Sequence, residues 1–162
     1  MLTEEIPVGT SAVGFRPKRI LVATDFSAAA NNAFSHARGI AQLTRAELIL
    51  IHVIEPDSSL VADALPPACM EELKANAEEN LRSLVQCAHK VGIPNTRSLM
   101  KSGLPAHEIV EVAKELNVDL IVIATHGFTS WKHFCIGSTA ERVARVAPCP
   151  VLVVREKERD FI

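Results

Sequence analysis

The sequence lacks the features that would place the protein in a membrane, on a nucleic acid or outside the cell. No stretch approaches the roughly 18 uncharged apolar residues of a membrane-spanning helix. The sequence has no run of basic residues and its formal net charge is -2, so the electrostatic footprint of a nonspecific nucleic-acid-binding protein is missing. The N-terminus carries Glu4 and Glu5 where a signal peptide has basic and then apolar residues. We therefore expect a cytoplasmic protein with no membrane and no nucleic-acid partner.

Motifs for several kinds of catalysis and metal binding are also missing. Without a C-x-x-C pair, neither a zinc site nor a disulfide framework is indicated by the cysteines, which are Cys69, Cys87, Cys135 and Cys149. The glycine motifs of P-loop NTPases (G-x-x-x-x-G-K-S/T) and of Rossmann dehydrogenases (G-x-G-x-x-G) do not occur. Asp25, His126 and Ser138 have the residue types of a serine hydrolase, but no G-x-S-x-G sequence surrounds Ser138. All of these enzyme classes are therefore disfavoured.

Apolar residues, by contrast, are plentiful and follow regular patterns. The chain has 162 residues, 48% hydrophobic and 22% charged, which is the size and composition of one globular domain. Short apolar runs alternate with stretches in which apolar residues recur every three or four positions. The runs predict strands at 19–24, 47–53, 96–101, 120–124 and 150–155. The periodic stretches predict helices from Ser27, at 70–91, from Pro105 and at 138–146, and 56–68 is expected to be a loop.

This alternation of strands and helices predicts an α/β fold, with a five-stranded parallel sheet and helices on both of its faces. In such sheets, ligands bind at the carboxyl ends of the strands. Residues 1–17 show no periodicity and contain glycine and proline, so we expect an N-terminal tail followed by one domain at 18–155. Residues 156–162 are expected to form a C-terminal tail.

The segment 118–146 combines a buried strand, a long loop and the start of a helix. Ser138 is followed three residues later by Glu141, which is the spacing of a capping box. A helix N-terminus offers unpaired N–H groups and about half a positive charge, and a preceding glycine allows a close approach, so Gly137 and Ser138 could hold phosphate oxygens. Alternatively, Gly137 only relieves a turn and Ser138 only caps the helix. The pattern alone leaves both interpretations open.

A family resemblance bears on this choice. The segment from Ala124 to Ser138 reads Ala-Thr-His-Gly, nine residues, Gly-Ser, and resembles the nucleotide motif of the universal stress protein family. That motif is Gly-x-x-Gly, nine residues, Gly-Ser/Thr, so alanine replaces its first glycine here. Residues 140–154 and 20–27 also resemble the closing and opening segments of the family. The resemblance covers residues 18–155 and identifies that range as a universal stress protein domain.

The resemblance implies a Rossmann-like fold of the adenine nucleotide alpha-hydrolase type, with strand order 3-2-1-4-5. Thr24 and Asp25 would then face residues 124–127, which are Ala124, Thr125, His126 and Gly127, across a crevice between strands one and four. It also implies that Asp25 and the Val53 backbone contact the adenine end of ATP, although Asp25 could instead cap the following helix. The ribose would be lined by Ala23, Ala124 and Gly127. The phosphates, bridged by a divalent cation such as Mg or Mn, would be wrapped by Gly127, Phe128, Thr129, Ser130, Gly137, Ser138 and Thr139.

We therefore expect an ATP-binding stress-response protein in which the nucleotide acts mainly as a conformational switch. Two alternatives remain: a dimeric protein-interaction module that binds no nucleotide, and a slow ATPase. The apolar strand Val151–Val154 would lie at the edge of the sheet, which predicts a homodimer through strand pairing. A downstream protein partner is expected, but the sequence does not identify it.

Overall fold

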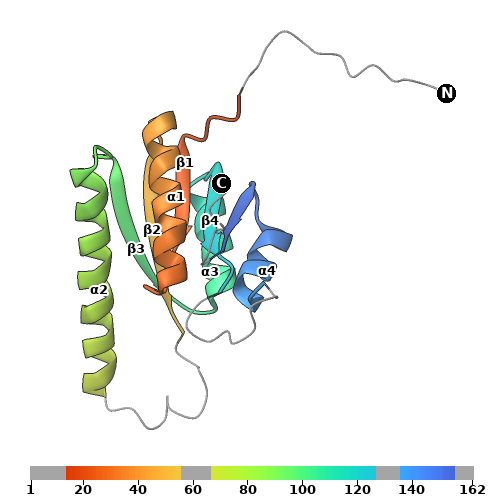
Figure 1. Ribbon diagram of the computed structural model, residues 1–162. Helices are drawn as coiled ribbons and strands as arrows, with labels where there is room; N and C mark the ends of the chain where they lie inside the picture. The colour runs from red at the N-terminus through yellow and green to blue at the C-terminus, as the bar shows by residue number, and fades with distance from the viewer. Residues whose placement is uncertain (1–13, 56–66, 127–135, 156–162) are drawn as a thin grey trace, which may run out of the picture.

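The computed structural model describes residues 14–55, 67–126 and 136–155, along which strands and helices alternate (Figure 1). All strand pairs are parallel, and the sheet order is β3-β2-β1-β4-β5. The predicted fold class and strand order are therefore confirmed. In the described part of the chain, the strands are β1 (Arg19–Ala23), β2 (Glu47–Ile54), β3 (Thr96–Ser102), β4 (Leu120–Ala124) and β5 (Val151–Val154), and the helices are α1 (Ala28–Thr44), α2 (Pro67–Lys90), α3 (Pro105–Glu115) and α4 (Ser138–Val146).

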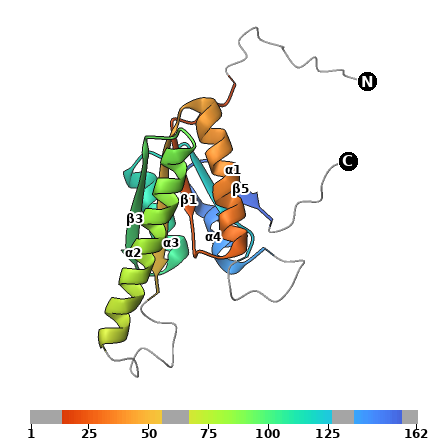
Figure 2. The ribbon, with the colours of Figure 1, turned by 60° about the vertical axis from the view of Figure 1, so that its left-hand side comes forward.

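Helices cover both faces of the sheet because the inner strands are apolar on both sides. Successive side chains of a strand point to opposite faces. Val22, Leu50 and Val122 accordingly pack in one cluster with residues of α1 and α2. Leu21 and Ile121 pack in a second cluster with residues of α3 and α4. Figures 1 and 2 show the sheet between these two pairs of helices.

Several element boundaries differ from the sequence prediction. Helix α2 begins at Pro67, three residues before the predicted start at Met70, because proline fits the first turn of a helix, where no hydrogen bond from its nitrogen is needed. The predicted loop at 56–68 is therefore wrong at its end, and its residues 56–66 lie outside the described residues. Strand β1 ends at Ala23 rather than at Thr24. At Thr24 the chain turns toward α1.

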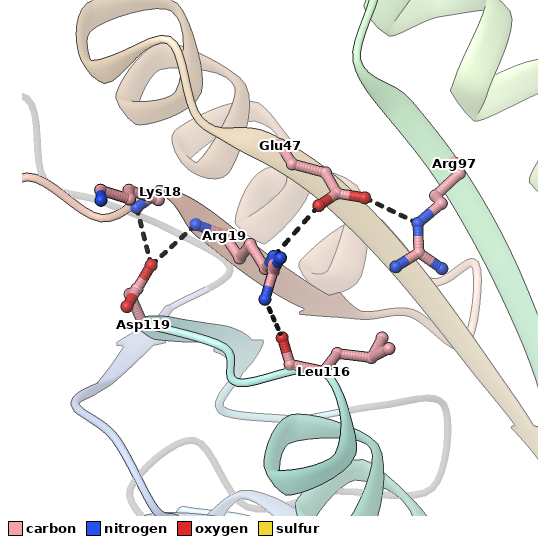
Figure 3. Close-up of polar contacts among 6 residues, drawn as sticks. All are labelled: Lys18, Arg19, Glu47, Arg97, Leu116 and Asp119. Carbon is pink, nitrogen blue, oxygen red and sulfur yellow. Dashed lines mark hydrogen bonds and ion pairs between the residues drawn. The ribbon is translucent and has the colours of Figure 1, made fainter.

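Charged side chains connect the amino-terminal ends of the strands (Figure 3). Glu47, at the start of β2, lies between Arg19 of β1, at 3.4 Å, and Arg97 of β3, at 2.7 Å. Asp119, just before β4, accepts from the backbone N–H groups of Lys18 and Arg19 at 2.8 and 2.9 Å. These contacts fix the starts of four strands relative to one another.

The predicted tails largely lie outside the described residues, which begin at Gly14 and end at Arg155. In the described part of the chain, none of the helices combines the length and apolarity that a membrane crossing requires.

Candidate functional site

A cavity of about 290 Å³ opens at the carboxyl-terminal ends of the central strands. Its walls come from the ends of β1, β2 and β4 and from the first turns of α1, α3 and α4. Strands β1 and β4 are neighbours, but the helices that follow them lie on opposite faces of the sheet. This is the position at which open α/β sheets bind ligands.

Most of the sequence-predicted site residues meet in this cavity. Those that line it are Ala23, Thr24, Asp25, Val53, Ala124, Thr125, His126, Gly137, Ser138 and Thr139. The other predicted residues, Gly127, Phe128, Thr129 and Ser130, lie outside the described residues. The structure thus brings together segments that are about 100 residues apart in the chain.

Sequence reasoning missed part of the wall. The additional lining residues are Ala30, Ile51, Glu55, Pro105, Ile109, Ile123 and Ala140. Ile51, Ile109 and Ile123 have the periodicity of core residues, so no sequence signal separates them from the core. Glu55 had a signal, because it is a carboxylate that follows an apolar strand, as Asp25 does.

The N-terminus of α4 forms one side of the cavity, and its cap differs from the prediction. Ser138 is the first helical residue and Gly137 is the N-cap, without any side-chain cap bond. The Gly137 N–H donates to the Thr125 carbonyl at 2.7 Å, which holds the glycine at the cap position. Glu141 pairs with Arg145 at 2.6 Å instead of folding back. The predicted capping box is therefore wrong. Neither Ser138 nor Glu141 provides the side-chain cap bond that this motif requires at the start of α4.

The turn between β1 and α1 forms the opposite side. Asp25 is half-buried, and its Oδ1 accepts from the Ser27 N–H at 3.0 Å. The Thr24 hydroxyl accepts from the Phe26 N–H at 3.0 Å, and Ser27 caps α1 through a bond from the Ala30 N–H at 3.2 Å. Asp25 thus has the local role that the sequence left open, and it also lines the cavity. An ionised carboxylate accepts several hydrogen bonds, so the two roles are compatible.

The segment after β4 adds polar groups. Thr125 is buried, and its N–H donates to the Val154 carbonyl at 2.8 Å. His126 Nδ1 lies 2.8 Å from the Thr125 hydroxyl, whereas its Nε2 is buried without a hydrogen-bond partner in the described part of the chain. A buried polar atom in this condition costs free energy unless a ligand or water pairs with it. His126 therefore presents unused hydrogen-bonding capacity beside the cavity.

Two further observations limit the chemistry of the site. Ala124, which replaces the first glycine of the family motif, is not among the described residues with positive φ, so the methyl group causes no backbone strain. Across the described ranges, no group of three or more His, Cys, Asp or Glu side chains could hold a metal ion. The arrangement offers N–H and hydroxyl donors at α4 and a carboxylate at the β1–α1 turn.

Comparison with known proteins gives a consistent family. The model of the universal stress protein family matches residues 17–155. A universal stress protein of Methanocaldococcus jannaschii is 37% identical over 145 residues, which are 88% of this chain and 85% of that protein. The structure of UspA from Lactobacillus plantarum superposes with a TM-score of 0.77 at 36% identity, covering 86% of this chain and 99% of that chain.

A second solved structure is a universal stress protein in complex with cAMP. It has a TM-score of 0.68 and 25% identity, and the match covers 88% of this chain and 99% of that chain. The family model thus spans nearly all of the described residues, and the two structures share the fold over 86% and 88% of this chain. On this evidence, the chain belongs to the universal stress protein family.

Proposed function

We propose that this protein binds ATP in the cavity between β1 and β4 and uses the nucleotide mainly as a conformational signal. One observation carries the proposal: a single cavity joins the N-terminus of α4, which has no side-chain cap, to the carboxylate of Asp25. These two ends have opposite chemistry. A nucleotide complements both ends, because its anionic phosphates can accept from the N–H groups of α4 and its adenine amino group can donate to the Asp25 carboxylate.

The phosphates would lie at α4. The Ser138 and Thr139 N–H groups belong to the first turn, where a helix has no intrahelical acceptors and about half a positive charge. Their hydroxyls add two donors, and His126 Nε2 adds a buried polar atom without a described partner. This donor set fits phosphate oxygens. A divalent cation, Mg or Mn, would be held by the phosphates and would neutralise part of their charge.

The adenine would lie near Asp25 and Val53, with Ile51, Ile109 and Ile123 as an apolar wall. Apolar walls with a few placed polar groups are typical of small-molecule sites. The related structure in complex with cAMP supports an adenine nucleotide as the ligand class. The proposal that the ligand is specifically a triphosphate rests on the N–H and hydroxyl donors at the start of α4.

Signalling fits the site better than rapid catalysis. Phosphoryl transfer is accelerated by cationic groups that neutralise developing charge and by a group that orients the attacking water. Among the described lining residues, none is arginine or lysine. Any hydrolysis by these residues should therefore be slow.

Residues 128–136 lie between the two ends of the nucleotide motif. Their Trp131 is the only tryptophan of the chain, so its fluorescence can report a change in this segment.

The decisive experiment is to denature protein purified without added nucleotide and to identify small molecules in the supernatant by mass spectrometry. Titration of the emptied protein with ATP and Mg²⁺, followed by calorimetry and by Trp131 fluorescence, then measures affinity and signal. We expect saturable binding and a fluorescence change. No bound nucleotide and no binding would leave the alternative of a protein-interaction module, whereas binding with rapid turnover would favour an ATPase.

The edge strand β5 supports a second proposal, a homodimer. Its residues Val151–Val153 are only half-buried although all are apolar. The Pro150 and Val154 carbonyls accept from the N–H groups of Ile121, in β4, and Thr125, just after it. Backbone groups alternate in direction, so those of Val151 and Val153 point away from the sheet. An exposed apolar edge of this kind pairs readily with a second strand. Antiparallel pairing with a second copy would satisfy these groups around a two-fold axis.

The proposed dimer can be tested with two matched proline variants. Val153→Pro removes a donor that faces outward, so it should convert the dimer to monomer in analytical ultracentrifugation at micromolar concentration. Ser98→Pro makes the same change on the opposite edge, β3, where the Leu48 N–H donates to the Asn95 carbonyl and Ser98 faces away from β2. This control should remain dimeric. A monomeric wild-type protein would refute the dimer.

A further inference from the structure

His52 contacts the β1–α1 turn from behind the cavity. Strand β2 alternates in direction, so Ile51 and Val53 line the cavity whereas His52, between them, points to the opposite face. There its Nδ1 lies 2.8 Å from the Thr24 carbonyl oxygen, and its ring lies against the Phe26 ring with centroids 4.5 Å apart. His52 therefore reaches the residues on both sides of Asp25 without lining the cavity itself.

The chemistry of this contact fixes the ring. A carbonyl oxygen only accepts hydrogen bonds, so His52 Nδ1 must carry the proton. His52 thus donates this hydrogen bond to the turn.

The turn needs support from outside itself. Phe26 has φ of 66°, a left-handed conformation that is uncommon for residues other than glycine, asparagine and aspartate. Such conformations persist where the surroundings over-determine them. The bonds made by the Thr24 and Asp25 side chains lie within the turn and would move with it. The His52 ring, in contrast, is carried by β2, which pairs with β1 and β3.

We propose that His52 is a positioning residue for nucleotide recognition, which holds the β1–α1 turn so that the Asp25 carboxylate faces the base. This inference rests on the proposed function. It assigns to His52 an effect on the adenine end of the site and none on the phosphate end. The effect passes through Asp25, so it should disappear when Asp25 is removed.

Three variants distinguish the effect of the His52 hydrogen-bond donor from the effect of its aromatic ring and from a general loss of stability. His52→Phe keeps an aromatic ring against Phe26 but leaves the Thr24 carbonyl without its donor. His52→Asn removes the ring but retains an amide N–H at nearly the position of Nδ1. His89→Phe is the matched control, because His89 Nε2 lies 3.2 Å from the Thr96 carbonyl on the same face of the sheet but outside the cavity. Melting temperatures identify any variant that fails to fold.

The measurements are ATP affinity with Mg²⁺, competition by inorganic triphosphate, and amide exchange of Phe26 and Ser27 without ligand. We expect His52→Phe to weaken ATP binding about three- to tenfold, the effect of one lost hydrogen bond. Triphosphate binding should be unchanged, turn amides should exchange faster, and His52→Asn and His89→Phe should behave as wild type. In an Asp25→Ala background, His52→Phe should change ATP affinity less than about twofold, since a shared mechanism is not additive.

Other outcomes overturn the inference. Wild-type affinity in His52→Phe, or an equal loss in the Asp25→Ala background, means that His52 does not act through Asp25. An equal loss for ATP and triphosphate means a general structural role. If the wild-type chain binds no ATP, the proposed function fails and the recognition role fails with it, while amide exchange still decides whether His52 holds the turn.

Discussion

At the amino-terminal ends of the strands, charged side chains pair with one another, whereas at the carboxyl-terminal ends polar groups surround a cavity. Glu47 is shared between Arg19 and Arg97, and its side chain is only 18% exposed. At the other end, α4 begins without a side-chain cap, and His126 Nε2 is buried with no partner in the described part of the chain. The described polar groups at the amino-terminal ends are thus paired within the sheet, whereas some at the cavity end have no described partner.

The largest expected effect is on binding at the cavity end. Asp25→Ala should weaken ATP binding by roughly 1.5 to 3 kcal/mol, the range for a hydrogen bond to a charged group. Asp25→Asn keeps an acceptor for the Ser27 N–H, so it should fold normally and weaken ATP binding less. Its amide can also donate to the guanine oxygen, so it should narrow the preference for ATP over GTP. Calorimetric titration of both variants with both nucleotides measures these effects.

Glu111 of α3, whose side chain is 41% exposed and pairs with Lys114, provides the control for removing a carboxylate. Glu111→Ala should leave ATP affinity unchanged, since the pair lies on the surface. If Asp25→Ala binds ATP with wild-type affinity while remaining folded, Asp25 serves only the turn. Asp25 would then be a structural residue, like the charged residues at the amino-terminal ends of the strands, and would no longer distinguish the two ends of the sheet.

The second prediction concerns the amino-terminal ends of the strands, where a substitution should lower stability and leave ATP affinity nearly unchanged. Asp119 accepts two backbone N–H groups at the amino-terminal end, so Asp119→Ala should lower the free energy of unfolding by about 2 kcal/mol. Affinity for ATP should stay within about twofold, because this carboxylate lies at the opposite end of the strands. Urea denaturation and calorimetry measure the two quantities on the same sample. A loss of affinity that matches the loss of stability would show that the two ends are coupled.

Local sequence patterns predicted much of this fold and part of the site. The five apolar residues of β4, all buried, left little choice but an inner strand. The capping box failed because Gly137 and Ser138 are both acceptable N-caps, and the choice between them depends on the Thr125 carbonyl, a contact outside the helix. The sharing of Glu47 between two arginines depends on strand pairing, which no local pattern contains. Contacts of this kind required the structure.

The left-handed turn at Phe26 escaped prediction for a related reason. Phenylalanine carries no sequence signal for positive φ, which glycine or asparagine would have given. The Phe26 ring lies against the ring of His52, a residue of β2 that no local pattern connects to it. Conversely, the carboxylate of Asp25 after an apolar strand was a usable signal, because a charge at such a position requires hydrogen-bond donors. Local chemistry thus indicated Asp25 as a lining residue, whereas the apolar lining residues Ala23, Val53 and Ala124 were predicted only from the family resemblance.

The smallest predicted effect concerns a thiol at the amino-terminal end of the sheet. Burial raises the pKa of the half-buried Cys149 thiol; a backbone hydrogen bond from Ile121 opposes this shift, and the charge of Asp119 adds to it. Only the thiolate reacts with maleimides, so a raised pKa lowers its fraction at a given pH and slows the reaction. In a variant with serine at Cys69, Cys87 and Cys135, the rate at Cys149 should titrate at higher pH than that of a model thiol. Asp119→Asn should shift this titration to lower pH, because it removes a negative charge that disfavours the thiolate. An unchanged profile would mean that the charge of Asp119 does not contribute to the pKa of Cys149.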